Sequence, residues 1–307
     1  MKKLRISIVE FLNTAPLVWG FTHGPLQDRY ELSFTVPSLC AEALRSGEAD
    51  LAIIPAVEYA RMDGMVMLPE MAVAAKGEVR SILVVAKKPI ESAKRIALDT
   101  NSRSSVALTR LLCGGLWRIS PEFVDAAPDP AAMLADADAA LVIGDPALSL
   151  RFQVDALASR RPAAGGCCGS HLGKQTDGLL ASVDTLFVYD VADQWRQMTG
   201  KPCVLAAWVG RREVITPEVV GDFLASKDYG LSHVGEIAET AALQLDLPAE
   251  YLGEYLTHNI DYSLDEDNLD GLRYYFELCA AANLTTRARA IEFADVPASA
   301  SRTQGMR

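Results

Sequence analysis

Apolar and polar stretches alternate along this chain in a pattern that occurs twice, about ninety residues apart. Residues 5–9 form a short apolar run that leads into a polar loop at residues 12–16. Residues 95–98 form a matching run, followed by a polar loop at residues 99–105. Short apolar runs bounded by polar loops are typical of buried β-strands. The pattern therefore predicts two strands that occupy equivalent places in a duplicated fold.

A second pair of matching segments follows downstream in each half. Each consists of an Asp, an apolar run and a turn containing Gly or Pro, at residues 50–55 and 138–146. Helix-like sequence separates the strands within each half. Strands that alternate with helices indicate parallel sheets, which bind ligands at the carboxyl ends of their strands. We therefore expect an α/β protein with two lobes and a central cleft.

Three further apolar runs indicate how the lobes are connected. Residues 81–86 and 185–190 lie at the two ends of the second lobe, and we expect them to cross between the lobes as a two-strand hinge. Residues 204–209 form an apolar strand that would complete the first sheet. The expected division is lobe one at residues 1–86 and 190–290, lobe two at residues 87–189, and a flexible tail at residues 291–307.

Capping residues predict several helix boundaries. One helix is expected to follow Pro37, with Ser38 as its N-cap and Gly47 closing it, because a serine hydroxyl caps a helix start and glycine suits a helix end. Asp129, followed by a proline, is the expected N-cap of another helix. Ser263 with Glu266 matches a capping box ahead of an apolar stripe near the C-terminus.

Composition and charge narrow the class of protein without naming a ligand. The chain has 307 residues, half of them hydrophobic, which is enough to fill the cores of two lobes. The net charge is −11, and the lysines and arginines are scattered, which argues against a nucleic-acid partner. Polar residues interrupt the N-terminal apolar run before it reaches the length of a signal peptide, and no stretch approaches a membrane span. We expect a cytoplasmic protein without a membrane partner. Its oligomeric state is left open.

The cysteines favour structural roles. Four of the six lie within apolar segments and are expected to be buried in a reducing compartment. Cys167 and Cys168 lie with His171 in a Gly-rich stretch, but adjacent cysteines lack the spacing of metal ligands. An insertion loop is the favoured interpretation, and no metal site is expected. The four in apolar segments are Cys40, Cys113, Cys203 and Cys279.

The usual catalytic and cofactor motifs are absent from the sequence. It contains no dinucleotide-binding or phosphate-binding glycine loop, no zinc-protease helix motif and no Gly-x-Ser-x-Gly. All four histidines lie outside the loops that follow the predicted strands, so a histidine base is not indicated. These loops instead offer polar side chains suited to holding an anion: Asn13, Thr14, Ser81, Asn101, Ser102, Arg103, Ser104, Ser105 and Asp145.

Six segments, in this order, resemble the chorismate dehydratase (MqnA) family of the futalosine route to menaquinone. The resemblance covers nearly the whole chain. Each segment is a weak signal alone, but their order along the chain is specific. The segments lie at residues 11–17, 46–55, 97–105, 141–145, 189–200 and 255–260, the last reading Tyr-Leu-Thr-His-Asn-Ile.

The resemblance implies a fold similar to the type II periplasmic binding proteins, which agrees with the two lobes expected above. It also implies a hydro-lyase that removes water from chorismate to give 3-[(1-carboxyvinyl)oxy]benzoate without a metal or organic cofactor. Loss of water makes the ring aromatic, so the substrate itself supplies the thermodynamic drive. The protein then mainly has to orient the substrate in a preorganised polar pocket.

Roles for individual residues follow from the same resemblance. Asn13 is expected to hydrogen-bond at the reacting ring, with Ser81 facing it across the cleft. Ser104 and Ser105, at a helix N-terminus, would hold a substrate carboxylate. Arg103 either neutralises a carboxylate or, as we favour, points into solvent, and Asp145 is expected to orient its loop. The remaining residues assigned to the substrate site are Thr14, Pro55, Ser102, Ile143 and Gly144.

Two departures from the family pattern stand out. Glu10 replaces an expected neutral residue and bears on the charge of the pocket. The stretch at residues 161–177 is longer than expected and is interpreted as a surface loop.

Three alternative functions remain open from the sequence. A small-molecule carboxylate-binding protein of the same fold would bind without catalysis. The later pathway enzyme 1,4-dihydroxy-6-naphthoate synthase has a similar architecture, but we expect a cleft histidine there. A ligand-sensing regulator would need a DNA-binding segment, for which we see no room before residue 5. Because the strand-end loops hold no histidine base, the substrate's own enolpyruvyl carboxylate is a candidate proton acceptor.

Overall fold

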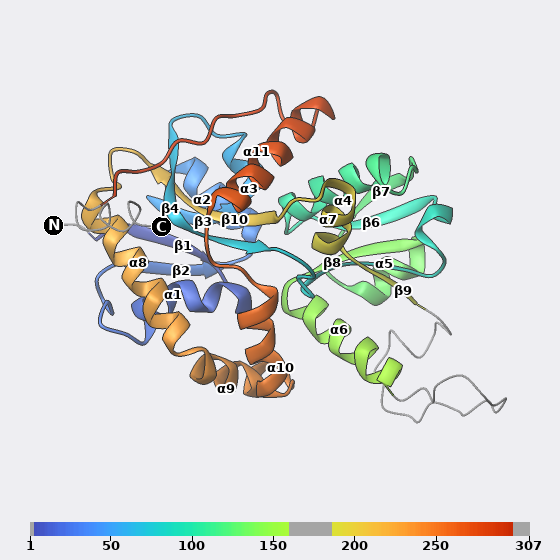
Figure 1. Cartoon of the computed structure of the whole chain (residues 1–307), viewed down its shortest axis with the longest axis horizontal. Coiled ribbons are helices and arrows are strands. Elements are labelled where there is room, and N and C mark those ends of the chain that lie inside the picture. The colour runs from blue at the N-terminus through green and yellow to red at the C-terminus, as the bar shows by residue number, and fades with distance from the viewer. Residues whose placement is uncertain (1–2, 160–185, 297–307) are drawn as a thin grey trace.

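The structure, a computed structural model, describes residues 3–159 and 186–296 and contains two sheets that lie side by side (Figure 1). The strands are β1 Arg5–Val9, β2 Glu31–Thr35, β3 Leu51–Pro55, β4 Met65–Ala75, β5 Ile82–Ala86, β6 Arg95–Asp99, β7 Glu122–Ala126, β8 Ala139–Ile143, β9 Phe187–Asp190 and β10 Cys203–Arg211. The helices are α1 Ala15–Thr22, α2 Pro37–Ser46, α3 Ala56–Tyr59, α4 Arg103–Gly115, α5 Pro130–Asp136, α6 Gly144–Ser159, α7 Val191–Thr199, α8 Pro217–Ser232, α9 Val234–Leu245, α10 Ala249–Glu254 and α11 Glu266–Ala281. Short 3-10 turns lie at Leu12–Thr14 and Ile90–Ser92, and a π-helical turn at Tyr255–Asn259.

The two sheets have the same topology, which confirms the two-lobed α/β fold and the internal repeat. The strand orders are β2-β1-β3-β10-β4 and β7-β6-β8-β5-β9. In each sheet the first three strands are parallel, and the fourth, which comes from a distant part of the chain, runs antiparallel to both its neighbours. The expected place of β10 in the first sheet is confirmed.

The repeat extends to two matching acidic residues. The backbone N–H of Asp50 donates to the carbonyl of Arg5, and the carboxylate of Asp50 accepts from the N–H of Arg5 at 2.9 Å. In the second sheet the backbone N–H of Asp138 likewise donates to the carbonyl of Arg95, and its carboxylate accepts from the N–H of Arg95 at 3.2 Å. Each Asp therefore joins the beginnings of two parallel strands.

The expected lobe boundaries are wrong at two places. β5 was expected to belong to lobe one, but it pairs with β8 and β9 within the second sheet. β9 lies at the edge of that same sheet, so it does not itself return to the first. The chain crosses between the sheets in the loop at residues 76–81 and again through α7 and residues 200–202.

The C-terminal tail also begins later than expected. Residues 292–294 lie against β4: the N–H of Met67 donates to the carbonyl of Glu292, and Phe293 bridges to Met67. The expected tail at residues 291–307 is therefore wrong for this segment, and residues 297–307 lie outside the described residues. The sequence pattern did not predict that residues 292–294 pack against β4. This contact depends on two backbone hydrogen bonds to Met67, which lies far away in the chain.

β5 illustrates why the strands of this protein are apolar along their whole length. All five of its residues are buried. Ile82 and Val84 belong to the large core that continues into the first lobe, whereas Leu83 and Val85 belong to a smaller core beneath α5 and α6. Sheets covered on both faces need apolar residues at both phases of the strand. The four cysteines in apolar segments are all buried and unpaired, as predicted.

Two of the four predicted helix caps are confirmed: Gly47, at φ +80°, ends α2, and Asp129 accepts from the N–H groups of the first turn of α5. The N-cap expected at Ser38 is wrong, because α2 already begins at Pro37 and Val36 is its N-cap. The capping box at Ser263 is wrong: Asp265 is the N-cap of α11, and the Ser263 hydroxyl donates to Asp261. An Asp two residues later competes for the same N–H groups, and the sequence pattern did not rank the two.

Two kinds of functional feature are absent from the described residues. Within residues 3–159 and 186–296, no helix is both long and apolar enough to cross a membrane. Within the same ranges, no three His, Cys, Asp or Glu side chains are grouped so that they could hold a metal ion. Cys167, Cys168 and His171 lie outside these ranges, and the cytoplasmic location stays a prediction.

Candidate functional site

A cavity of about 40 Å³ lies between the two lobes at the carboxyl ends of their parallel strands. Lobe one contributes residues that follow β1 and end β3, and lobe two contributes residues at the start of β5 and the end of β8. The cavity is lined by Val9, Phe11, Asn13, Thr14, Pro37, Pro55, Val73, Ser81, Ile82, Ser102, Ile143, Gly144, Leu205 and Ala206.

Seven of the eleven residues assigned from the sequence line this cavity. Asn13 and Ser81, which come from different lobes, are both among them. The others are Thr14, Pro55, Ser102, Ile143 and Gly144. Arg103, Ser104, Ser105 and Asp145 do not line it. The structure therefore brings the expected catalytic pair to one cavity, while the roles of these residues stay predictions.

The lobes meet closely beside the cavity. Gly144 has φ +67°, and a Cβ atom at this position would lie 2.7 Å from the ring of Phe11. Glycine is required on both counts, because the left-handed conformation disfavours other residues and the ring leaves no room. Next to it, the Asp145 carboxylate accepts a hydrogen bond from the backbone N–H of Leu12 at 3.1 Å. This contact is with a loop of the opposite lobe and not with the loop that Asp145 was expected to orient, so the role of Asp145 stays a prediction.

Asp145 is buried in this contact. Burial raises the pKa of its carboxyl to about 6, and the charge of Glu10 acts in the same direction, against the hydrogen bond from Leu12. Glu10 therefore acts on Asp145, which does not line the cavity, and its expected effect on the charge of the pocket stays a prediction. Two carboxylates close together disfavour each other's ionisation.

Asn13 and Ser81 each make a hydrogen bond within the protein. The Asn13 side-chain oxygen accepts from the hydroxyl of Thr14 at 3.3 Å. The Ser81 oxygen accepts from the hydroxyl of Tyr255 at 2.8 Å, and both of these residues are buried. Sequence analysis did not single out Tyr255, although it begins the last of the six segments that carried the resemblance.

The serines at the start of α4 make contacts within the protein. Ser102 is the N-cap, and its oxygen accepts from the N–H of Ser105. Ser104 accepts from the backbone N–H of Val57 at 3.2 Å, which joins the lobes a second time. Of the three serines, Ser102 alone lines the cavity, so the expected carboxylate contact of Ser104 and Ser105 stays a prediction.

Arg103 lies in neither of the surroundings expected for it. Its guanidinium donates to Glu58 at 3.0 Å and to Glu42 at 2.6 Å, both in lobe one. Glu58 also pairs with Arg45 and Arg61, and its side chain has no exposed surface. Arg103 therefore neutralises carboxylates of the protein across the lobe boundary. The sequence could not reveal this because its partners are 61 and 45 residues away.

The cavity lining is uncharged and mostly apolar, with four polar side chains from Asn13, Thr14, Ser81 and Ser102. Its fourteen residues include no Asp, Glu, His, Lys or Arg. Asn, Ser and Thr side chains can donate and accept hydrogen bonds but cannot act as ordinary bases near neutral pH. The arrangement can therefore orient a polar guest and stabilise developing charge, but its lining residues offer no proton acceptor.

The size of the cavity indicates that the structure is a closed arrangement of the lobes. Sites for small organic ligands typically enclose about 300–1,000 Å³. A cavity of about 40 Å³ is too small for such a ligand, so the lobes must separate for one to enter. The contacts at Gly144, Asp145, Ser104 and Arg103 are those that opening would have to change.

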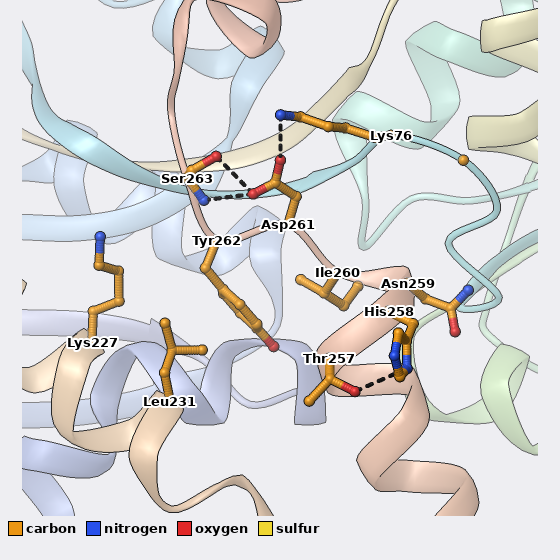
Figure 2. Close-up of a pocket in the computed structure, with 11 residues that line it drawn as sticks. Lys76, Lys227, Leu231, Thr257, His258, Asn259, Ile260, Asp261, Tyr262 and Ser263 are labelled. Carbon is orange, nitrogen blue, oxygen red and sulfur yellow. Dashed lines mark hydrogen bonds and ion pairs between the residues drawn. The ribbon is translucent and has the colours of Figure 1, made fainter. Parts of the chain in front are cut away.

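A larger groove of about 550 Å³ lies elsewhere, between α8, the π-helical turn and the segment that precedes α11 (Figure 2). It contains none of the residues assigned from the sequence. The Lys76 ammonium pairs with Asp261 and Asp265, and the Lys227 ammonium donates to the carbonyl of Glu70. Both lysine cations are thus already engaged within the protein, and the smaller cavity is the better candidate site.

Comparison with known proteins assigns the chain to a family. A family model described as menaquinone biosynthesis matches residues 4–281, which include both lobes and the whole cavity lining. The chain belongs to this menaquinone biosynthesis family. A chorismate dehydratase from Thermus thermophilus is 28% identical over 279 residues, covering 90% of this chain and 95% of that protein.

The chain shares its fold with solved structures of low sequence identity. Protein AF1704 from Archaeoglobus fulgidus superposes with a TM-score of 0.65 at 19% identity, covering 92% of this chain and 98% of that one. The periplasmic aliphatic sulphonate binding protein SsuA from Escherichia coli superposes with a TM-score of 0.56 at 17% identity, covering 94% and 95%. These likenesses confirm the periplasmic-binding-protein fold expected from the sequence.

Proposed function

We propose that this protein is a chorismate dehydratase, which eliminates water from chorismate to give 3-[(1-carboxyvinyl)oxy]benzoate in the futalosine route to menaquinone. Membership of the menaquinone biosynthesis family and the similarity to a chorismate dehydratase support this proposal. The observation that carries it is that Asn13 and Ser81, from opposite lobes, line one cavity. Once the lobes have separated to admit it, a small organic acid would lie between hydrogen-bonding groups from both lobes.

The proposed reaction needs little acid or base chemistry from the protein. A ring C–H bond breaks, its electron pair forms the new ring double bond, and the ring C–O bond breaks as hydroxide departs. The proton passes to the substrate's enolpyruvyl carboxylate and is then available to the hydroxide, so the net loss is one water. An uncharged lining is consistent with a base supplied by the substrate. Asn13 and Ser81 would stabilise the charge that develops at the departing hydroxyl.

The first experiment is incubation of the purified protein with chorismate, followed by mass spectrometry. We expect a product lighter than chorismate by one water, with the absorbance of an aromatic ring. Chorismate that binds but is recovered unchanged would instead identify a carboxylate-binding protein of the same fold. A protein that neither binds nor converts chorismate contradicts the proposal.

Two variants test the proposed catalytic pair. Asn13→Ala and Ser81→Ala are each expected to lower kcat by about a hundredfold, the usual effect of removing one donor to a developing charge. Ser33→Ala is a matched control, because the Ser33 hydroxyl donates to the carbonyl of Ile6 in the first sheet and does not line the cavity. Wild-type kcat in either cavity variant would refute the assigned roles.

The proton acceptor is tested separately. Asp145 follows the lining residue Gly144 in the sequence, and its carboxylate accepts from the N–H of Leu12. We expect Asp145→Asn to retain turnover, because the substrate supplies the base. Loss of turnover with retained chorismate binding in this variant would show that the protein supplies the base instead.

A further inference from the structure

Tyr255 makes a contact that the proposed function leaves unexplained. Its side chain is buried, and its hydroxyl donates to the Ser81 oxygen at 2.8 Å. The Asn13 side chain also approaches this hydroxyl, and its hydrogen bond and that of Ser81 lower the pKa of Tyr255. Burial is the larger effect and holds that pKa far above its usual range, so Tyr255 stays protonated at any working pH. It can serve as a hydrogen-bond donor but not as a base.

The local backbone explains how Tyr255 reaches this place. It begins the π-helical turn Tyr255–Asn259, a widened turn of the kind often found at functional sites. At the other end of the turn, the Asn259 amide donates to the carbonyl of Glu78 at 3.0 Å. The turn therefore contacts the first crossing segment at two points, one of them at Ser81 itself.

The direction of the hydrogen bond matters for Ser81. A hydroxyl has one proton to donate and two lone pairs that accept. A phenol is the stronger acid of the two groups, so Tyr255 donates and occupies one lone pair of the Ser81 oxygen. Among the described residues we find no acceptor for the Ser81 proton. Since Ser81 lines the cavity, its proton is left to point toward a bound guest.

We propose that Tyr255 is a positioning residue for the dehydration of chorismate, and that it directs the Ser81 proton into the cavity by occupying the opposite side of the Ser81 oxygen. This inference rests on the proposed function. It assigns the contact with the reacting substrate to Ser81 and the orientation of Ser81 to Tyr255.

A double-mutant cycle tests the inference. Tyr255→Phe is expected to lower kcat about tenfold in the wild-type background, the size of one neutral hydrogen bond. In the Ser81→Ala background the same change should lower kcat less than twofold, because the oxygen that Tyr255 orients is gone. Equal losses in both backgrounds would show that Tyr255 acts through general packing, and the inference would be wrong.

Tyr262→Phe is the matched control. Tyr262 is buried in the same region of the chain, and its hydroxyl has no hydrogen-bond partner within residues 3–159 and 186–296. Loss of this hydroxyl should leave kcat within twofold of wild type. A tenfold loss here would mean that removing any buried hydroxyl nearby is enough to lower kcat, which overturns the inference.

A second measurement keeps this test separate from that of the proposed function. The hydroxyl proton of Tyr255 can be observed by NMR and assigned by its loss in Tyr255→Phe. In Ser81→Ala this resonance should shift upfield or broaden, because its acceptor is missing. If the wild-type protein does not convert chorismate, the proposed function fails, and this resonance still decides the contact. An unchanged resonance in Ser81→Ala overturns the inference.

Discussion

Replacing Glu58 by glutamine tests whether a buried ion cluster holds the two lobes together. Glu58 lies in α3 of lobe one, and its side chain has no exposed surface. Its carboxylate pairs with Arg45, with Arg61 at 2.7 Å and with Arg103 of lobe two at 3.0 Å. Glutamine has nearly the same shape but carries no charge. The substitution therefore leaves three guanidinium groups around a neutral side chain.

The expected magnitude follows from burial. Removing one partner from a fully buried ion pair costs about 3–5 kcal/mol, because the remaining charge stays desolvated. Here the side chains of Arg45, Arg61 and Arg103 are 38%, 35% and 31% exposed, so solvent screens them and the loss should fall below that range. Glu42 provides a matched control, since it pairs with two of the same arginines, Arg45 and Arg103, but its side chain is 46% exposed. Ion pairs at such exposed positions are worth about 0–1 kcal/mol. Glu58→Gln should thus lower the free energy of unfolding several times more than Glu42→Gln.

Urea denaturation followed by circular dichroism measures both variants. Burial disfavours the charged form of Glu58, but hydrogen bonds from Arg45 and Arg61 and the charge of Arg103 hold its pKa below the usual value. A carboxyl with a lowered pKa in the folded state stabilises the protein above the unfolded pKa and loses that effect as pH falls. The difference between wild type and Glu58→Gln should therefore shrink below about pH 4.5. Equal losses for the two variants at neutral pH would refute the reasoning.

Two further substitutions probe the closed arrangement of the lobes. Gly144→Ala should abolish closure of the lobes and lower both turnover and stability, because the added Cβ would lie 2.7 Å from the ring of Phe11. Gly64→Ala is the control, because Gly64 has φ +73° but no described atom within 4 Å of an added Cβ. In the same denaturation assay it should show only the conformational cost of about 1–2 kcal/mol. The raised pKa of Asp145, about 6, means that its charge destabilises the folded state as pH rises through the range of about 4 to 6. Asp145→Asn should therefore be more stable than wild type by roughly 2–3 kcal/mol near pH 7.5 and equal to it near pH 4. A variant that is less stable than wild type at both pH values would contradict the raised pKa of Asp145.

The sequence by itself determined the architecture and half of the site. The repeated apolar runs and their polar loops predicted two equivalent α/β lobes, because strands buried on both faces carry a local signal that needs no partner to be recognised. The same loops contained Asn13, Thr14 and Ser81, since ligands of such sheets bind at the carboxyl ends of the strands. Asp129 at a helix start and Gly47 at a helix end were predictable for the same reason, because caps act within one turn.

The tertiary structure alone decided which distant groups meet. Tyr255 reaches Ser81 across 174 residues, Arg103 reaches Glu58 across 45, and Leu12 reaches Asp145 across 133. Such pairs leave no periodic trace, because each depends on how the two lobes are oriented and not on either segment alone. The placement of β5 in the second sheet was missed for the same reason: an apolar strand suits either sheet, and only its hydrogen-bonded neighbours determine which one it joins.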